Sequence, residues 1–184
     1  MHQRNLLIVD DEENVLTAFE RTLMDENYTI ESAQSGEKAL EKLTLFPAGI
    51  ILSDYMMPGM NGLELLQKIK QRYPDTIRIL ITGRSDMQIT IEAINKGDIF
   101  RFLLKPWDDD ELKMALRTAF QYHDLLHENR KLLTTIKKQS SLLEEIESKY
   151  PGITKIKTEE DGTIVFEDEE CEDIVHTFQL KGKE

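Results

Sequence analysis

Short apolar runs alternate along the chain with longer stretches in which apolar residues recur at helical spacing. The short runs are rich in Leu, Ile and Val, which predicts buried β-strands. The longer stretches carry apolar residues three or four positions apart, which predicts amphipathic helices. The expected strands cover residues 6–10, 28–33, 49–54, 77–82 and 99–104, and the expected helices cover residues 13–26, 36–46, 62–73 and 86–96.

This alternation indicates the fold class. Strands separated by helices of this size form βαβ units, and such units build a parallel sheet that is covered by helices on both faces. We therefore predict an α/β protein with a doubly wound, five-stranded parallel sheet. With the strand order 2-1-3-4-5, the first and third strands are neighbours in the sheet.

A fifth helix is expected from about residue 108, where an acidic first turn precedes periodic apolar residues. No Gly or Pro interrupts it before Pro151-Gly152. With Leu112 as heptad position a, nine of the twelve a and d positions up to Tyr150 are apolar or aromatic. A helix of about 40 residues is roughly 60 Å long, which is more than the sheet needs. We expect it to pair with a second copy through residues 112–150, and the alternative is a helix that folds back on its own domain.

The last part of the chain differs again in composition. Residues 151–184 carry ten acids and four lysines. Asp161-Gly162 lies between two short β-prone runs, which predicts a two-residue hairpin. So small a unit is not stable alone. The sequence thus predicts a domain at 1–122, a coiled-coil extension of the fifth helix at 123–150, and a small acidic β-hairpin or meander at 151–184.

Composition and charge narrow the class of protein. With 40% hydrophobic and 32% charged residues, the chain of 184 residues resembles soluble globular proteins. No apolar run approaches the length of a membrane span, and the N-terminal apolar run is too short for a signal peptide. A single cysteine, Cys171, excludes an internal disulfide. We therefore expect a cytoplasmic protein, and the net charge of −12 argues against direct nucleic-acid binding.

Polar residues follow the predicted strands at the ends where a doubly wound sheet binds its ligands. Asp10 and Asp11 follow the first strand, Asp54 ends the third, Thr82 ends the fourth, and Lys105 follows the fifth. Carboxylates there can hold Mg²⁺, and one carboxylate can act as a nucleophile toward a phosphoryl group. The ammonium and hydroxyl groups can stabilise phosphoryl oxygens. The simpler alternative is that Asp11 only caps the following helix.

These motifs, in this order, resemble the receiver domain of two-component response regulators. The resemblance covers residues 1 to about 122 and rests on "VDDE" at 9–12, "SDYMMPGMNG" at 53–62, "ITG" at 81–83 and "FLLKP" at 102–106. It implies a flavodoxin-like receiver fold. It also implies a protein that is not an enzyme in the ordinary sense, because it catalyses only its own phosphorylation and dephosphorylation.

The resemblance implies a role for each matching residue. Asp54 would accept a phosphoryl group from a cognate histidine kinase or phosphotransfer protein. Mg²⁺ would be held by Asp10, Asp11, Asp54 and the backbone carbonyl of Met56. Thr82 and Lys105 would bind the phosphoryl group, and Phe102 would be the aromatic switch. The remaining matching residues would shape the site, with Lys105-Pro106 commonly a cis peptide: Gly83, Pro106, Pro58 and Gly62.

The output of such a switch is predicted from the residues around and after the fifth strand. "INKGDIFRFLLKPW" at 94–107 resembles receivers found ahead of HD-GYP phosphodiesterases, but no motif of that output domain follows. We expect output through the long helix to a downstream protein of unknown identity. One alternative is the receiver part of a larger cyclic-di-GMP-related regulator. Another is a phosphatase with an aspartate nucleophile, although such enzymes carry Asp-x-Asp after the first strand. A DNA-binding regulator is disfavoured by the charge and by the missing reading helix.

Overall fold

The structure, a computed structural model, describes residues 4–83 and 98–151. It contains a five-stranded, fully parallel sheet in the order β2-β1-β3-β4-β5. The strands are β1 (Asn5–Val9), β2 (Thr29–Ala33), β3 (Ile50–Asp54), β4 (Ile77–Thr82) and β5 (Arg101–Leu104). The helices are α1 (Glu13–Thr22), α2 (Gly36–Leu43), α3 (Gly62–Arg72) and α5 (Asp109–Lys149). The predicted fold class and strand order are confirmed.

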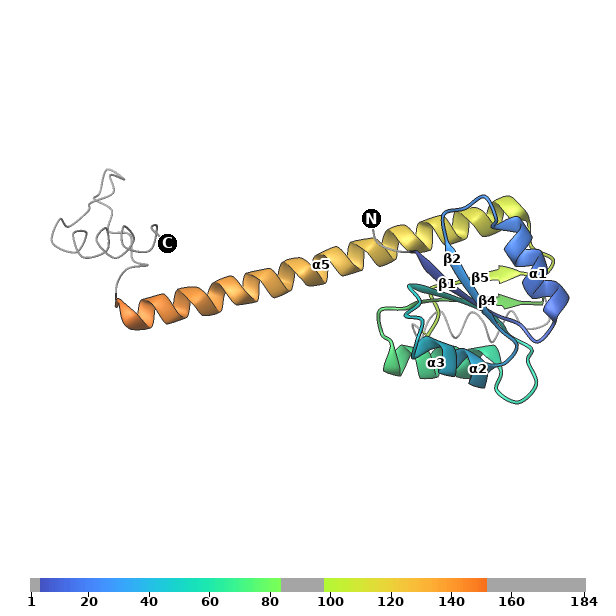
Figure 1. Cartoon of the computed structure of the whole chain (residues 1–184), viewed down its shortest axis with the longest axis horizontal. Coiled ribbons are helices and arrows are strands. Elements are labelled where there is room, and N and C mark those ends of the chain that lie inside the picture. The colour runs from blue at the N-terminus through green and yellow to red at the C-terminus, as the bar shows by residue number, and fades with distance from the viewer. Residues whose placement is uncertain (1–3, 84–97, 152–184) are drawn as a thin grey trace. The chain divides into compact units, whose positions relative to one another are not determined.

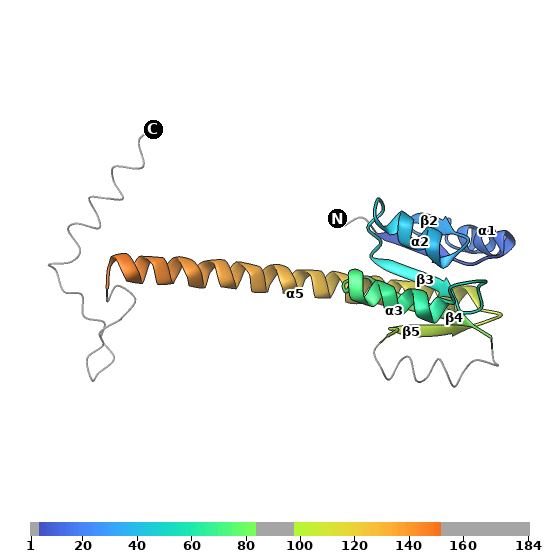
Figure 2. The same cartoon turned by 90° about the horizontal axis from the view of Figure 1, so that it is seen from below.

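Helices cover both faces of the sheet (Figure 1). On one face, α1 and the first part of α5 pack on alternate strand residues such as Leu6 and Ile8. On the other face, α2 and α3 pack on the intervening residues, such as Leu7 and Val9. Figure 2 views the sheet from below, with α2 and α3 in front of the strands. Because both faces are buried, the central strands contain continuous apolar runs, as in β1 and in residues 50–52 of β3. The edge strand β2, with the sequence TIESA, is only partly buried.

Side-chain caps begin two of the helices. The Ser35 Oγ accepts a hydrogen bond from the Lys38 N–H at 3.3 Å before α2, and the Asn61 Oδ1 accepts one from the Glu64 N–H at 2.9 Å before α3. Capping oxygens of this kind satisfy amide groups that have no partner within the helix. They fix where α2 and α3 begin, and Gly62, the first residue of α3, lies close to the end of β3.

Several predicted boundaries shift in the structure. The first helix ends at Thr22 rather than residue 26, because the chain turns there before β2. The fifth strand begins at Arg101 rather than residue 99. The predicted helix at 86–96 and the predicted acidic β unit at 151–184 lie outside the described residues, except for Pro151.

The chain divides into two compact units, Met1–Lys131 and Leu132–Glu184. α5 is one continuous helix from Asp109 to Lys149, so the predicted long helix is confirmed. None of the described helices combines the length and hydropathy that a transmembrane span needs.

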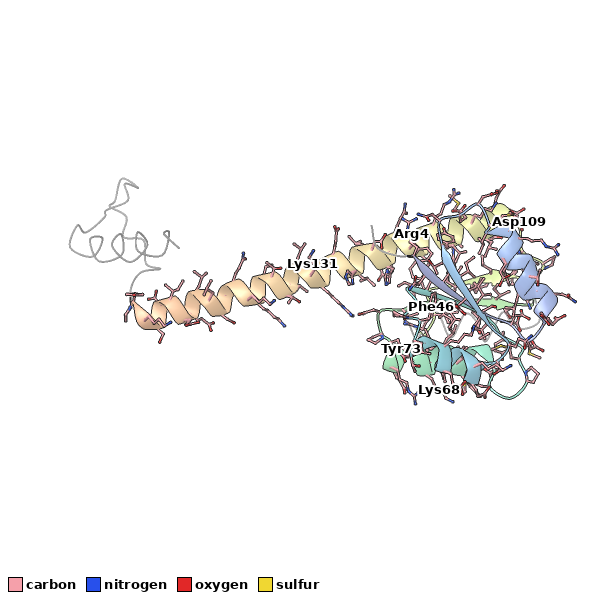
Figure 3. All side chains as sticks on the ribbon, viewed as in Figure 1. Arg4, Phe46, Lys68, Tyr73, Asp109 and Lys131 are labelled. Carbon is pink, nitrogen blue, oxygen red and sulfur yellow. The ribbon has the colours of Figure 1, made fainter. Side chains whose placement is uncertain are left out.

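Within the first unit, the part of α5 from Tyr122 to Arg130 contacts the segments that precede β1, β4 and β5. Tyr122 stacks on Phe100 with ring centroids 5.1 Å apart. Asp124 pairs with Arg4 at 3.8 Å, and Figure 3 shows Arg4 beside α5. Arg130 forms an ion pair with Asp75. These contacts attach α5 to its own domain as far as Arg130.

A truncation tests how much of α5 the first unit needs. Residues 1–131 should unfold with a free energy close to that of the first unit within the full chain. Residues 1–117 should lose about 3–5 kcal/mol, because Phe120 is buried in the core and stacks on Tyr28. Urea unfolding followed by Trp107 fluorescence measures both free energies. Equal stability of the two fragments would contradict this account of the α5 packing.

Candidate functional site

The carboxyl ends of four strands meet at one edge of the sheet. Asp10 follows β1 directly, Asp54 is the last residue of β3, Thr82 is the last of β4, and Lys105 follows β5. β1 and β3 are neighbours, and the chain continues outward from them in opposite directions to β2 and to β4. Such a reversal of strand order opens the crevice in which doubly wound sheets bind ligands.

Lys105 joins the two carboxylates in this crevice. Its Nζ lies 2.9 Å from Oδ2 of Asp10 and 2.6 Å from Oδ1 of Asp54. Asp10 is 1% exposed and Asp54 is 5% exposed. Burying two carboxylates this close together is unfavourable unless a cation lies between them. The ammonium supplies one positive charge against two negative ones, so the group keeps a net negative charge when both acids are ionised.

Backbone amides orient the same two carboxylates. The Glu12 N–H donates to Oδ1 of Asp10 at 2.9 Å, and the Met56 N–H donates to Oδ2 of Asp54 at 2.7 Å. Each carboxylate is thus held between an amide on one oxygen and Lys105 on the other. Fixed donors of this kind hold a reacting group in place without reorganisation.

Burial and charge shift the ionisation of this group. Burial raises the pKa of Asp10, and the negative charge of Asp54 adds to that increase, while the Glu12 amide and Lys105 act in the opposite direction. For Lys105, burial by itself lowers the pKa, but the hydrogen bonds and charges of Asp54 and Asp10 together raise it. The ammonium form of Lys105 is therefore the one that faces the two acids.

Asp11 is the predicted site residue that the structure does not bring into this cluster. It is exposed, next to the buried Asp10. Within residues 4–83 and 98–151, no three His, Cys, Asp or Glu side chains are grouped closely enough to hold a metal ion. The N-cap of α1 is Glu12, without a side-chain cap hydrogen bond, so Asp11 does not cap that helix either.

Thr82 and Gly83 lie at the end of β4, beside Lys105. Thr82 is buried, and its Oγ1 donates to the Gly83 carbonyl oxygen at 3.3 Å. The Lys105 N–H donates to the Thr82 carbonyl oxygen at 2.8 Å, which extends the β4–β5 pairing to the site. The backbone therefore fixes Lys105 relative to Thr82.

The loop after β3 leads from Asp54 to the start of α3. Met56 is 68% exposed, Pro58 is exposed, and Gly59 has a φ of +78°, a conformation that favours glycine. Gly62 makes the closest approach, because a Cβ at this position would lie 1.9 Å from the backbone oxygen of Asp54. The predicted shaping role of Gly62 thus has a steric reason that the sequence does not show.

The segment that carries Lys105 is anchored on its two sides. Phe102 is partly buried against the core that β4, α2 and α3 share. The Lys105-Pro106 peptide is cis, as the resemblance implied. Trp107 stacks on Phe19 of α1 with ring centroids 4.2 Å apart, a contact that sequence reasoning did not find. Its only signal in the sequence is the aromatic residue after Pro106.

Comparisons with known proteins agree with this geometry. Residues 6–117 match the family described as the response regulator receiver domain. The hydrogenase transcriptional regulatory protein HoxA of Cupriavidus necator is 36% identical over 123 residues, which is 67% of this chain and 25% of HoxA. The chain thus spans about a quarter of the length of this relative, and a similar share, 24%, of the regulator NtrC of Klebsiella pneumoniae.

Solved structures give the same result. The signal receiver domain of an HD domain-containing protein from Pseudomonas fluorescens Pf-5 has a TM-score of 0.64 and 38% identity, over 67% of this chain and 98% of that domain. A structure described as the adenylate cyclase from Rhodopirellula baltica has a TM-score of 0.69 and 31% identity, over 72% of this chain and 98% of that one. With its parallel sheet and its acids gathered on one lysine, this chain belongs to the response regulator receiver domain family of two-component signalling.

Proposed function

We propose that Asp54 accepts a phosphoryl group from a histidine kinase or a phosphotransfer protein, and that this switches the contacts of the chain with other proteins. Receiver domains are regulatory phospho-acceptors, and response regulators interact with histidine kinases. The observation that carries the proposal is the pair of buried carboxylates, Asp10 and Asp54, on the single ammonium of Lys105. Asp54 ends its strand at the crevice, where a donor can approach it.

In the proposed reaction, a carboxylate oxygen of Asp54 forms a bond to phosphorus while the bond from phosphorus to the donor breaks. From a phosphohistidine the leaving group is the imidazole, whose nitrogen takes the electron pair. Lys105 then pairs with the phosphoryl group, and the Thr82 hydroxyl donates a hydrogen bond to a phosphoryl oxygen. The Met56 amide keeps the carboxyl group oriented throughout.

The residues present fit a hard divalent cation. Two buried carboxylates exceed the charge of Lys105, and oxygen ligands of this type suit Mg²⁺. We propose that Asp10, Asp11, Asp54 and the backbone carbonyl of Met56 hold it. When bound, Mg²⁺ would neutralise the charge of the phosphoryl oxygens.

The fluorescence of Trp107 can report metal binding. Trp107 is the only tryptophan in the sequence and lies two residues from Lys105. Mg²⁺ should change its fluorescence in a saturable way, and Asp10→Asn should weaken the apparent affinity about tenfold or more, since it removes a charged ligand. Asp25→Asn, an exposed acid outside the crevice, is the matched control and should titrate like the wild type. An Asp10→Asn titration identical to the wild type would contradict the proposed ligand set.

The proposed readout is the long helix and the chain that follows it. Entry of the phosphoryl group would draw Thr82 and Phe102 inward and change the surface from which α5 starts. Residues 123–150 would then act as a coiled coil in a homodimer paired through residues 112–150, with the acidic segment 151–184 presented to a downstream protein. The exposed apolar residues of α5 support this pairing. The net charge of −12 argues against direct nucleic-acid binding.

A second candidate is the receiver part of a larger regulator related to cyclic-di-GMP. The similar receiver from Pseudomonas fluorescens belongs to an HD domain-containing protein, and the "FRFLLKPW" sequence at 100–107 favours that kind of receiver. The receiver chemistry is the same in both candidates, so they differ only in output. A phosphatase with an aspartate nucleophile is the remaining alternative.

Intact-protein mass spectrometry after incubation with Mg²⁺ and acetyl phosphate tests the proposal. The wild type and Asp25→Asn should gain the mass of one phosphoryl group, and Asp54→Asn should gain none. Equal labelling of Asp54→Asn would refute the role of Asp54. Continuous hydrolysis of a phosphomonoester, with no stable label, would instead favour the phosphatase.

A further inference from the structure

Trp107 lies between the candidate site and the start of α5. Lys105, two residues before it, contacts both buried acids of the site, and α5 begins two residues after it, at Asp109. The indole ring is partly buried and stacks on Phe19 of α1, with the ring centroids 4.2 Å apart and the ring planes at 14° to each other. Two rings stacked in this way form a contact with a defined geometry.

Phe19 gives the indole ring a fixed surface. Phe19 is 1% exposed and belongs to the same core cluster as Leu6 and Ile8 of β1. Because protein cores are closely packed, the Phe19 ring cannot move away from Trp107 without opening this core. The position of Trp107 is thus set by the core that packs on β1, and β1 is the strand that leads to Asp10.

The residues after Trp107 are held as well. The Thr22 hydroxyl at the end of α1 donates to Oδ1 of Asp109 at 3.2 Å. Figure 3 shows Asp109 at the start of α5, next to α1. Oδ1 of Asp108 accepts hydrogen bonds from two amide groups in the first turn of α5, at 3.0 Å each. Residues 107–109 are therefore fixed by α1 and by the beginning of α5.

Two chain segments meet at the site and again at the aromatic stack. One segment, residues 10–22, begins at Asp10, and the other, residues 105–109, begins at Lys105. Three contacts join these segments: the ion pair of Lys105 with Asp10 at 2.9 Å, the stack of Trp107 on Phe19, and the hydrogen bond of Thr22 with Asp109. Because a single residue separates Lys105 from Trp107, a displacement of the indole ring also displaces the lysine.

We propose that Trp107 is a positioning residue, which keeps the Lys105 ammonium between Asp10 and Asp54 by stacking on Phe19. This role rests on the proposed function, since Lys105 is the residue that would pair with the phosphoryl group. Trp107 acts through Lys105 rather than on the phosphoryl group itself.

The position of the ammonium depends on the main chain on both sides of Lys105. On one side, the Lys105 N–H donates to the Thr82 carbonyl oxygen at 2.8 Å, which fixes the chain to β4. On the other side, the stack of Trp107 supplies the fixed point. The lysine stem is flexible and 28% of the Lys105 side chain is exposed, so it has room to turn away from the acids. In an active site, a misplacement of about 1 Å can cost about 100-fold in rate.

A second aromatic stack provides a matched control. Tyr28 stacks on Phe120 of α5 with ring centroids 4.8 Å apart, and it is also partly buried against the core. Tyr28 directly precedes β2, at the amino edge of the sheet, whereas the site lies at the carboxyl edge. Tyr28→Leu therefore removes a contact of the same kind between α5 and the core without touching the segments that meet at the site.

Acetylation by acetic anhydride, followed by peptide mapping of the full-length chain, measures how firmly Lys105 is held. The Lys105 nitrogen must leave the two carboxylates before it can attack the reagent, so the rate follows the population of this local opening. Trp107→Leu should raise the acetylation rate of Lys105 about threefold or more. Phe19→Leu removes the other ring of the stack and should have the same effect.

Tyr28→Leu should leave the acetylation rate of Lys105 unchanged, and the exposed Lys149 should react equally in all variants. An unchanged Lys105 rate in both Trp107→Leu and Phe19→Leu would overturn the proposal. So would an equal increase in Tyr28→Leu, because a general loss of stability would then explain the result. Circular dichroism during urea unfolding compares the stabilities, since the Trp107 variant has no tryptophan fluorescence.

The rate of phosphoryl labelling tests whether the effect passes through Lys105. With Mg²⁺ and acetyl phosphate, Trp107→Leu should lower the initial rate about tenfold or more. Trp107→Phe keeps a ring that can stack and should stay within about twofold of the wild type. In a chain that already carries Lys105→Met, Trp107→Leu should have no further effect, because the group that it positions is absent. An equal loss in both backgrounds would show that Trp107 acts by another route.

The two measurements separate this role of Trp107 from the proposed function. Acetylation needs no phosphoryl transfer, so it reports the hold on Lys105 whether or not Asp54 takes a label. A wild type that takes no label would refute the proposed phosphorylation, and the acetylation rates would still decide whether Trp107 positions Lys105.

Discussion

Gly62→Ala should destabilise the protein by about 3 kcal/mol, the upper end of the cost of overpacking a core. The added Cβ would lie 1.9 Å from the Asp54 backbone oxygen and 2.8 Å from its carbonyl carbon. These are backbone atoms at the end of β3, the middle strand of the sheet, so no side-chain rotation can relieve the contact. Either α3 must move away from β3 or the end of β3 must move, and both displace Asp54.

Gly36→Ala is the matched control for this prediction. Gly36 is also buried and is also the first residue of its helix, α2. Its Cβ would meet the side chain of Met60, with Sδ at 2.9 Å, and a flexible methionine can rotate away. Urea unfolding should therefore show a change within about 1 kcal/mol for Gly36→Ala, comparable to the helix preference of alanine over glycine. Equal effects of the two substitutions would contradict the steric account of Gly62.

Lys105→Met should slow phosphoryl labelling of Asp54 by about 100- to 1000-fold, on the order expected for loss of a fixed donor in an active site. Methionine keeps the length and apolar stem of lysine but removes the ammonium that contacts both Asp10 and Asp54. The two buried acids would then repel each other with no cation between them. The positive charge that faces the incoming phosphoryl group would also be lost.

Lys105→Arg separates charge from shape in the same experiment. It keeps the cation but spreads it over a planar group that cannot replace a compact ammonium between two carboxylates. We expect labelling intermediate between the wild type and Lys105→Met, measured as the initial rate with acetyl phosphate. Labelling of Lys105→Met at the wild-type rate would show that the ammonium has no part in the reaction.

The sheet could be predicted from the sequence because its central strands are buried on both faces. The runs Leu6–Val9 and 50–52 are continuously apolar, and helices of regular spacing separate the strands, so strand number and direction follow from the pattern. Boundaries were less accurate. The end of α1 at Thr22 depends on a turn closed by backbone hydrogen bonds, such as Leu23 N–H to Phe19 O, which any sequence can form.

The site could be predicted as a set of strand-end residues, and Asp10, Asp54 and Lys105 do meet. The sequence could not show that one ammonium serves both acids, or that Asp11 stays exposed beside them. Nor could it show the steric contact of Gly62, because that depends on the approach of two backbones. The docking of α5 through Arg130 also escaped prediction, since its heptad pattern is the same whether a helix packs on its own domain or on another copy.

The central claim is that Asp54 carries the phosphoryl group, and the most direct measurement is the position of the label. Borohydride reduces an aspartyl phosphate to homoserine, so peptide mapping of the labelled and reduced chain identifies the residue. The account predicts homoserine at position 54 in the wild type and at no position in Asp54→Asn. Homoserine at Asp10 or Asp11, or retention of the label through borohydride treatment, would contradict it.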